Sequence, residues 1–441
     1  MTDARFPLTR RHALAGLGGL ILGPGAPAAA AAAPRQVLAL QARPATAALR
    51  GGAPDVSVWS LGATPDGALR FRRGDEVEVT LDNQLPIPVT LNWHGLDGIA
   101  AAEPLTRRPP LAAGGKDTLV LPLRHAGTLL CDLRLLGDNQ PRPLPARAIV
   151  VTETEPVPAD RDETLLIEDW RLGADGPLAP GGSARDAITV YTVNGRSSAD
   201  ITLRANDRLR LRIINGCHRN AIALKIHDHE ATVMAIDGQP SEPFLAREGA
   251  LVLAPGSRVD AFIDAVRSPG STSPIVLHDG KEPRTIGRLL TSSEAPARSA
   301  PLAAPRPLPS NGLPPQLELK NAQRLELTLG GTSGPQPDWM APGALTAATT
   351  PAFRTKAGRV VVLALTNRAS MPTVFHLHGH HFRLLDRLDD GWKPFWLDTL
   401  LVDVGQTQRI AFAAAARGRW LMEAMAADWG APRLVRWFAV E

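Results

Sequence analysis

The chain has 441 residues, of which 44% are hydrophobic, and it carries a formal net charge of only +4. This length exceeds what one hydrophobic core usually accommodates and suits two or three domains. No run of lysine and arginine is dense enough to indicate a nucleic-acid partner, and beyond the N-terminal segment no apolar stretch is long enough to span a membrane.

Residues 1–33 have the order of an export signal. Arg10 and Arg11 follow Thr9 and precede an apolar run rich in glycine and alanine, which ends in small residues typical of a cleavage site. The paired arginines resemble a twin-arginine signal. Because the apolar run is short for a membrane span, we expect cleavage, a periplasmic location and no stable membrane insertion. The alternative is an N-terminal membrane anchor.

Three segments predict strands and form a weak internal repeat: "GDEVEVTLDN", "NDRLRLRIIN" and "AGRVVVLALTN". The first two alternate apolar and polar residues, as half-buried strands do, and the third is continuously apolar, as a central strand is. Clear amphipathic helices are scarce, and 40 prolines and 39 glycines punctuate the chain. The pattern therefore indicates an all-β class, with sandwich domains in three related copies.

Composition suggests where these copies begin and end. Residues 293–316 are rich in proline and alanine and read as an extended linker, and a softer boundary lies around residues 152–163. We therefore expect domains over 34–155, 156–292 and 317–441, with the linker crossing between the second and third domains without forming core.

Cys131 and Cys217 are the only cysteines. One disulfide is possible in an oxidising compartment. Their local contexts, however, look like strands of different domains, so we expect two free, buried thiols.

The stretch "MPTVFHLHGHHF" places His376, His378 and His380 at alternating positions, with His381 beside the last. Alternate side chains of a strand share a face, so the pattern suggests the rim of a metal site. For His380 and His381 we expect side chains that point to the surface and to the core in turn.

Together with a second segment, this stretch resembles a known family. "LPIPVTLNWHGLDG" resembles the first copper motif of multicopper oxidases, whose core is His-Trp-His-Gly, and "FHLHGHHF" resembles the third, His-Pro-x-His-x-His-Gly. The resemblance covers nearly all of the mature chain. It implies three cupredoxin-like (plastocyanin-like) Greek-key β-sandwich domains. It also implies a mononuclear copper that takes electrons from substrate and a trinuclear copper cluster, between domains one and three, that reduces oxygen.

The family's copper chemistry needs about ten histidines and one cysteine, because copper takes imidazole and thiolate ligands in fixed geometry. Aligned without gaps, this chain keeps His94, His376 and His378 as remnant ligands. Eight ligand positions carry other residues: Asn92 in the first motif, Asp132 and Arg134 in the second, Thr373 in the third, and Glu423, Ala424, Met425 and Trp429 in the fourth. The electron-accepting copper thus loses its thiolate and both histidines, and we assign no catalytic residue.

Two interpretations of the altered centre follow. In the first, Asp132, Arg134 and Glu423 share one cavity, and Arg134 lies within about 4 Å of one of the two carboxylates, so no cofactor is expected. In the second, the three histidines and a carboxylate bind copper or another single metal, because mixed imidazole and carboxylate ligands suit copper, zinc and iron.

The resemblance therefore predicts an exported, degenerate multicopper oxidase-like protein without laccase activity. It is similar in its losses to copper-free periplasmic relatives that support cell division as binding proteins. We expect a binding or scaffold role toward an unidentified periplasmic protein or small molecule, and not toward nucleic acid. The alternative is a copper-binding oxidoreductase of the family with a reduced, altered centre.

Overall fold

The computed structural model describes residues 35–64, 69–137, 140, 142–173, 176, 178–179, 187–330, 339–386 and 391–441. The export signal expected over residues 1–33 lies outside them. Among the described residues, no helix has the length and apolar character needed to cross a membrane.

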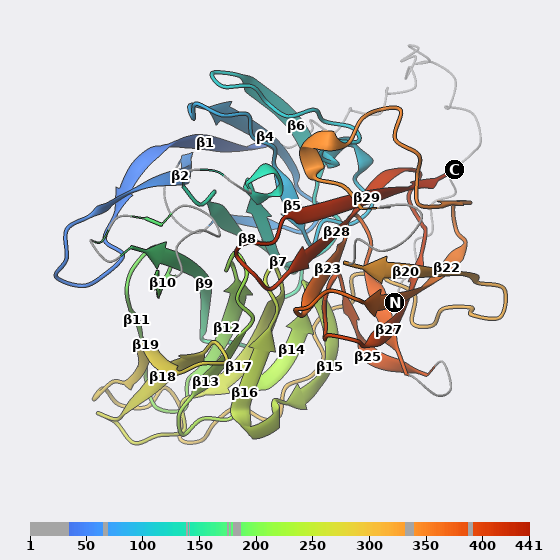
Figure 1. Cartoon of the computed structure of the whole chain (residues 1–441). Helices are drawn as coiled ribbons and strands as arrows, with labels where there is room; N and C mark the ends of the chain where they lie inside the picture. The colour runs from blue at the N-terminus through green and yellow to red at the C-terminus, as the bar shows by residue number, and fades with distance from the viewer. Residues whose placement is uncertain are drawn as a thin grey trace, which may run out of the picture. The chain divides into compact units, whose positions relative to one another are not determined.

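The strands of the described residues form six sheets, which fall into three pairs along the sequence (Figure 1). The first pair has the orders β2-β1-β4-β6 and β3-β8-β7-β5. Its strands are β1 (Gln36–Ala47), β2 (Val56–Thr64), β3 (Leu69–Arg72), β4 (Glu76–Asn83), β5 (Asn92–His94), β6 (Lys116–Pro122), β7 (Gly127–Asp132) and β8 (Ala146–Thr152).

The second pair has the orders β10-β9-β12-β17-β14-β15 and β11-β19-β18-β13-β16. Its strands are β9 (Arg161–Leu172), β10 (Ile188–Val193), β11 (Ala199–Leu203), β12 (Arg208–Asn215), β13 (Ile222–Ile226), β14 (Thr232–Ile236), β15 (Gln239–Leu245), β16 (Ala250–Leu253), β17 (Arg258–Asp264), β18 (Thr272–His278) and β19 (Pro283–Thr291).

The third pair has the orders β20-β22-β27-β24-β25 and β21-β29-β28-β23-β26. Its strands are β20 (Gln323–Leu329), β21 (Arg354–Thr355), β22 (Val360–Asn367), β23 (Thr373–Leu377), β24 (Phe382–Leu385), β25 (Trp392–Leu397), β26 (Thr399–Val402), β27 (Thr407–Ala413), β28 (Gly418–Ala426) and β29 (Arg433–Val440). Short 3₁₀ turns are the helical elements of the described residues: η1 (Ala100–Ala102), η2 (Arg134–Leu136), η4 (Arg247–Gly249) and η5 (Pro342–Ala344).

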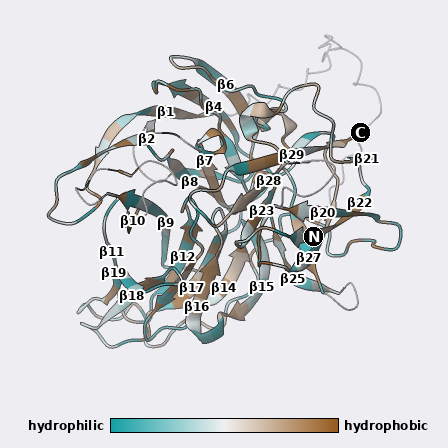
Figure 2. Cartoon of the chain, viewed as in Figure 1, coloured by the Kyte–Doolittle hydropathy of each residue, from teal (hydrophilic) through white to brown (hydrophobic). Residues whose placement is uncertain are grey.

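The same strand pairings recur in each pair of sheets. The parallel pairs β1–β4, β9–β12 and β20–β22 correspond, as do the antiparallel pairs β5–β7, β13–β18 and β23–β28. Each pair encloses an apolar core with side chains from both sheets, such as Val79 with Val151 and Leu363 with Met422. Figure 2 shows hydrophobic stretches along strands such as β14 and β17. The expected all-β sandwich class is confirmed.

The asparagine that ends each repeated strand has one structural role in all three copies. Asn83, Asn215 and Asn367 are fully buried. In each, the side-chain oxygen accepts a hydrogen bond from the backbone N–H two residues on. The side-chain nitrogen donates to a nearby carbonyl and to one on a distant segment. The asparagine therefore closes the loop that follows the strand, which explains the repeat.

The prediction that β12 is half-buried is wrong, because all eight of its residues are buried. Arg210 lies 2.7 Å from Asp260 and 2.8 Å from Glu153, and Arg212 lies 2.9 Å from Asp260 and 2.7 Å from Asp162. The arginine face meets the first pair of sheets, since Thr128 of β7 donates to Asp260 at 2.6 Å. Buried guanidinium groups are tolerated here because carboxylates neutralise them.

Residues 293–316 are the segment that the sequence predicts to be a linker. Residues 293–316 contain no strand or helix, all of them being described. The expectation that they form no core is wrong, however, because Leu308 is 6% exposed and packs with Met234 and Phe262. Asn311 is also buried and bonds to both backbone groups of Ala126, at 2.9 and 2.8 Å. Cys131 and Cys217 are free and buried, as expected.

We predict that replacing any repeat asparagine lowers stability. Asn215→Ala leaves two carbonyls and one N–H without their partner, and a buried unsatisfied group costs about 1–3 kcal/mol. Urea unfolding of Asn215→Ala and Asn367→Ala measures this loss. Asn321→Ala, at an exposed turn position, is the control and is expected to change stability by less than about 0.5 kcal/mol. Equal stability of wild type and both buried variants would refute the role assigned to these side chains.

Candidate functional site

Two equivalent strand pairs carry the residues singled out by the sequence. In the first pair of sheets, β5 and β7 are antiparallel neighbours, and Asn92 lies opposite Asp132. In the third, β23 and β28 have the same relation, and His376 lies opposite Glu423. The rings of His376 and His378 are 4.8 Å apart, as expected for alternate positions on one face.

These two strand pairs meet. Asn92 Nδ2 donates to Glu423 Oε1 at 2.8 Å, across 331 positions of sequence. The rings of His94 and His376 are 4.1 Å apart, and His376 Nε2 lies 3.4 Å from the Trp93 carbonyl oxygen. His94 therefore lies beside His376, which in turn lies beside His378.

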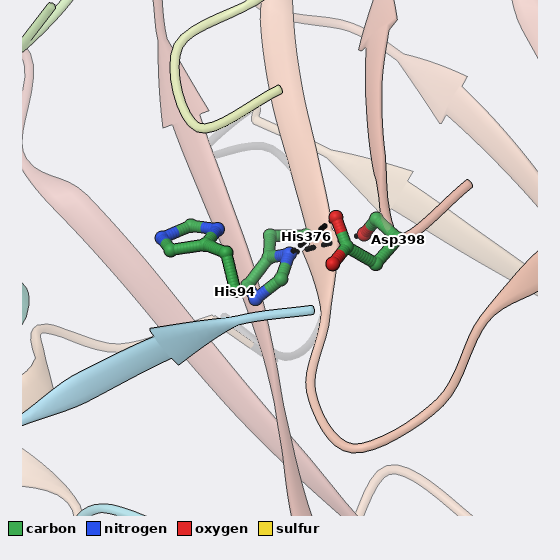
Figure 3. A group of neighbouring side chains, drawn as sticks. All are labelled: His94, His376 and Asp398. Carbon is green, nitrogen blue, oxygen red and sulfur yellow. Dashed lines mark hydrogen bonds and ion pairs between the residues drawn. The ribbon is translucent and has the colours of Figure 1, made fainter. Parts of the chain in front are cut away.

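His376 is held by the segment between β25 and β26. Its Nδ1 lies 3.0 Å from the carbonyl oxygen of Asp398 and 3.7 Å from the carboxylate of the same residue (Figure 3). The pKa of His376 lies well below its ordinary value, mainly because the ring is buried and also because His94 is near. The ring is therefore neutral at neutral pH. The Asp398 carboxylate is also paired, because both its oxygens accept hydrogen bonds from Arg258 at 2.8 and 2.7 Å.

His378 lies between two buried carboxylates. Its Nδ1 is 3.1 Å from Glu103 and its Nε2 is 2.8 Å from Glu423. Burial alone would lower the pKa of His378, but the two carboxylates raise it to about 10. Both nitrogens of the resulting imidazolium are donors, so neither offers a lone pair to a metal. Sequence reasoning missed Glu103, which lies in the loop after η1 and belongs to no motif.

Glu423 has a second cationic partner. Arg433 of β29 donates to Glu423 Oε2 at 2.6 Å. Burial would raise the pKa of Glu423, but Arg433 and His378 hold it well below its ordinary value. Sequence reasoning also missed Arg433, which reaches Glu423 because β28 and β29 are antiparallel neighbours. Glu103, His378, Glu423 and Arg433 thus form a chain of alternating charge.

The expectation that Arg134 pairs with Asp132 or Glu423 is wrong. Its guanidinium lies 2.7 Å from Glu168 of β9 and donates to the carbonyl oxygens of Leu144 and Gly216. The reason is local, because β7 ends at Asp132 and η2 begins at Arg134. The Asp132 carboxylate accepts a hydrogen bond from the backbone N–H of Arg134 at 2.9 Å, and Arg134 no longer follows the alternation of the strand.

Asp132 instead pairs with a remnant histidine. Its Oδ2 lies 3.4 Å from His94 Nε2. Burial would raise the pKa of Asp132, but the bond to His94 and the nearby Arg134 and Arg433 lower it below the ordinary value. The other ring nitrogen of His94, Nδ1, is buried and makes no hydrogen bond within the described part of the chain.

Four other positions that the resemblance assigns to copper ligands carry side chains that pack against their neighbours. Ala424 lies in the core of the third sheet pair, and Met425 packs with Ala254 and Val374. Thr373 bonds weakly to Asn367 at 3.3 Å. The ring of Trp429 stacks on His218, with 5.3 Å between centroids. These four positions, which the family resemblance assigns to copper ligands, supply no imidazole and no thiolate.

The two histidines that end the "HLHGHH" stretch are both buried. The expected surface position of His380 is wrong, because its ring is 5% exposed and lies among Phe412, Trp420 and Phe438. His381 points inward as expected, and its Nδ1 lies 2.7 Å from Asp97. His380 is buried because aromatic side chains of β27, β28 and β29 in the third core surround its ring.

The site contains side chains of the kinds that bind metal ions. Two groups hold donor atoms that all lie within 4.8 Å of one another: His94, His376 and Asp398, and His376, His378 and Glu423. His376 belongs to both. The carboxylates of both groups already bind arginine, and His378 is bonded at both nitrogens. The residues present therefore do not fit the family's copper relay, and they fit a single metal only if ion pairs are broken.

Sequence comparison relates most of the chain to multicopper oxidases. Three sequence signatures described as multicopper oxidase match residues 43–130, 153–279 and 316–441. The chain is 26% identical over 434 residues to the multicopper oxidase MmcO of Mycobacterium tuberculosis, covering 84% of this chain and 81% of that protein. It is 26% identical over 233 residues to Laccase-2 of rice, Oryza sativa, covering 47% of this chain and 41% of that protein.

Structural comparison agrees. A crystal structure of a multicopper oxidase from Pseudomonas thermotolerans superimposes with a TM-score of 0.77 and 26% identity. The match covers 92% of this chain and 99% of that chain. The cupredoxin-like β-sandwich class expected from the motifs is therefore confirmed.

We predict that Arg134 is energetically coupled to Glu168 and not to Glu423. Arg134→Ala leaves a buried carboxylate without its cation, and such a loss costs about 3–5 kcal/mol. Double-mutant cycles measured by urea unfolding separate the partners. The Arg134→Ala and Glu168→Gln cycle is expected to give a coupling of about 0.5–3 kcal/mol. The matched cycle with Glu423→Gln is expected to give a coupling near zero. Stronger coupling to Glu423 would restore the pairing expected from sequence.

We predict that stability falls with rising pH because of His378. The pKa of His378 is raised from 6.5 to about 10 on folding. The ion pairs therefore contribute fully below pH 6.5, and their contribution is lost as the pH rises through about 10. The free energy of unfolding of wild type and His378→Gln, measured across this range, tests the sign. The variant is expected to lose much of the slope, and a slope that is unchanged in the variant contradicts the assignment.

Proposed function

The chain belongs to the multicopper oxidase family, and we propose that it is an exported member in which ion pairs replace the copper relay. In this proposal it works as a binding or scaffold protein of the periplasm and not as a laccase. The one observation that carries the proposal is the set of side chains at the electron-accepting copper position: Ala424, Thr373 and Trp429.

The first support is the missing thiolate. A blue copper centre needs a cysteine sulfur and two imidazoles. The chain has only two cysteines, Cys131 on β7 and Cys217 after β12, and both are buried thiols with pKa values raised by burial. Neither lies at the fourth motif, where Ala424 stands. A protein without this centre has no ordinary entry for electrons from a phenol or a metal ion.

The second support comes from the side chains that stand at the ligand positions of the oxygen-reducing cluster. Asn92, Asp132 and Glu423 stand at three of its ligand positions, and each is engaged in hydrogen bonds or ion pairs. The guanidinium of Arg433 reaches this same region, and a fixed cation repels a metal cation. These side chains therefore favour a structural role for this region over oxygen reduction.

A fold that is intact but lacks the copper relay can still bind a partner, so we propose a binding role. We propose a partner in the periplasm, either a protein or a small molecule. Export is supported by the sequence alone, through Arg10, Arg11 and the small residues that follow the apolar run. The twin-arginine pathway exports folded proteins, which suits a chain whose three sheet pairs are joined by buried ion pairs.

In a second candidate function, the protein binds a single metal ion at the remnant histidines. The donor atoms of His94, His376 and Asp398, and those of His376, His378 and Glu423, are close enough to bind one ion. The unbonded Nδ1 of His94 is the specific observation that favours it. In that case the protein is a copper-binding oxidoreductase of the family with a reduced centre.

We predict that the purified protein contains far less than one copper per chain, shows no blue-copper absorption and does not consume oxygen with phenols or metal ions. Metal analysis, visible absorption and oxygen uptake measure this, with the Mycobacterium tuberculosis relative prepared in the same copper-supplemented medium as the positive control. A blue protein with a full copper complement would contradict the proposal.

Thermal unfolding with and without zinc or copper decides the second candidate. A single-metal site predicts a large rise in the melting temperature of wild type, lost in both His94→Ala and His376→Ala. The ion-pair interpretation predicts no metal response in any of the three proteins.

A further inference from the structure

The segment between β19 and β20 contacts all three sheet pairs. We call residues 298–317 the strap. They contain no strand or helix, and six of them are proline. A proline-rich chain is extended and stiff before it folds, so it loses less conformational entropy when it is fixed against a surface.

The strap begins on the second sheet pair. Asn206 Nδ2 donates to the Arg298 carbonyl oxygen at 2.7 Å, and the Arg298 guanidinium donates to the Asn206 carbonyl oxygen at 2.6 Å. Further along, Leu308 packs on Met234 and Phe262. These two side chains belong to β14 and β17 but lie outside the core of the second pair. The strap therefore covers the outer face of one sheet.

The strap then crosses to the first sheet pair. Arg73 donates to the Ser310 carbonyl oxygen at 2.7 Å. The side chain of Asn311 is buried, bonds to both backbone groups of Ala126 and donates to Gln239 Oε1 at 3.0 Å. Because Ala126 precedes β7 and Gln239 begins β15, one side chain of the strap joins the first pair to the second.

Beside Asn311 the backbones of the two pairs leave no space for a side chain. A Cβ atom on Gly127 would overlap the carbonyl group of Gly238, and Gly127 has a φ of 147°. Asn311 Nδ2 also lies 3.3 Å from the Gly238 carbonyl oxygen. The strap thus bonds to both sides of a direct backbone contact.

The strap ends on the third sheet pair. Leu313 and Leu317 pack with Val362 of β22 and Trp396 of β25. Leu317 is buried. The strap is therefore anchored at both ends by packing or hydrogen bonds, and its middle carries the asparagine that reaches the first pair.

We propose that the strap is a clasp that keeps the first sheet pair closed on the second. Its anchors on the second and third pairs hold Asn311 in place against the first. The interface that the clasp closes has its own apolar cluster, in which Leu130 and Ala146 pack on side chains of β9 and β12 and which contains no strap residue. Loss of a strap anchor opens this interface while each pair keeps its core.

The clasp requires neither a metal nor a ligand, so it is independent of the function proposed above. Thiol labelling of the full mature chain tests it. Ala146→Cys places a thiol in the interface between the first and second pairs, where position 146 is 8% exposed. Cys131 and Cys217 lie in the cores of these pairs and report unfolding. Mass spectrometry separates the three labelling rates, and position 146 is expected to react faster than both core thiols.

Asn311→Ala and Leu308→Ala are introduced separately into Ala146→Cys. Each is expected to raise the labelling rate at position 146 about 10-fold or more, because losing a buried hydrogen-bonding group or a buried leucine side chain favours the open state by roughly that factor. Leu308→Ala leaves the hydrogen-bonding groups of Asn311 in place, so the two variants test the clasp independently if one of them fails to fold.

The matched control is Asn367→Ala, which removes a buried asparagine whose hydrogen bonds stay within the third sheet pair. Its labelling rate at position 146 is expected to equal that of Ala146→Cys alone. Labelling at position 146 that is no faster than at Cys131 and Cys217 overturns the clasp, because the interface then opens only when the chain unfolds. So does a rate that is unchanged in both strap variants, or one that rises equally in Asn367→Ala.

Discussion

The neutralisation of one buried carboxylate, Glu423, is the constraint on which the centre of the molecule depends. A buried charge without a partner is strongly destabilising. Glu423 meets this requirement with partners from three segments: Asn92 on β5, His378 after β23 and Arg433 on β29. Because Asn92 belongs to the first sheet pair and Glu423 to the third, satisfying this carboxylate also fixes the contact between the two.

The same principle joins the other sheet pairs. Arg134 at the end of β7 pairs with Glu168 on β9, which links the first pair to the second. Arg258 on β17 pairs with Asp398 before β26, which links the second to the third. Each contact between sheet pairs therefore contains a buried ion pair. Our proposal that ion pairs replace copper concerns the contact between the first and third pairs alone, where Glu103 pairs with His378, and Glu423 pairs with His378 and Arg433.

The same ion pairs border a cavity. Arg433 and Arg134, which neutralise Glu423 and Glu168, are among the residues that line it. Trp429, at a position that the family resemblance assigns to a copper ligand, lies in the wall of this cavity and stacks on His218.

The sequence by itself determined the β class, the threefold repeat and the family, because strand periodicity and the copper motifs are local patterns. It also identified His94, His376 and His378 as neighbours through the resemblance. Only the tertiary structure decided which charges pair. Arg134 turns from Asp132 to Glu168 because the strand ends before it, and Glu103 and Arg433 reach the site through a loop and a strand register that no motif encodes. Likewise Arg210 and Arg212 look solvent-exposed in an alternating strand, and they are buried because another pair of sheets covers that face.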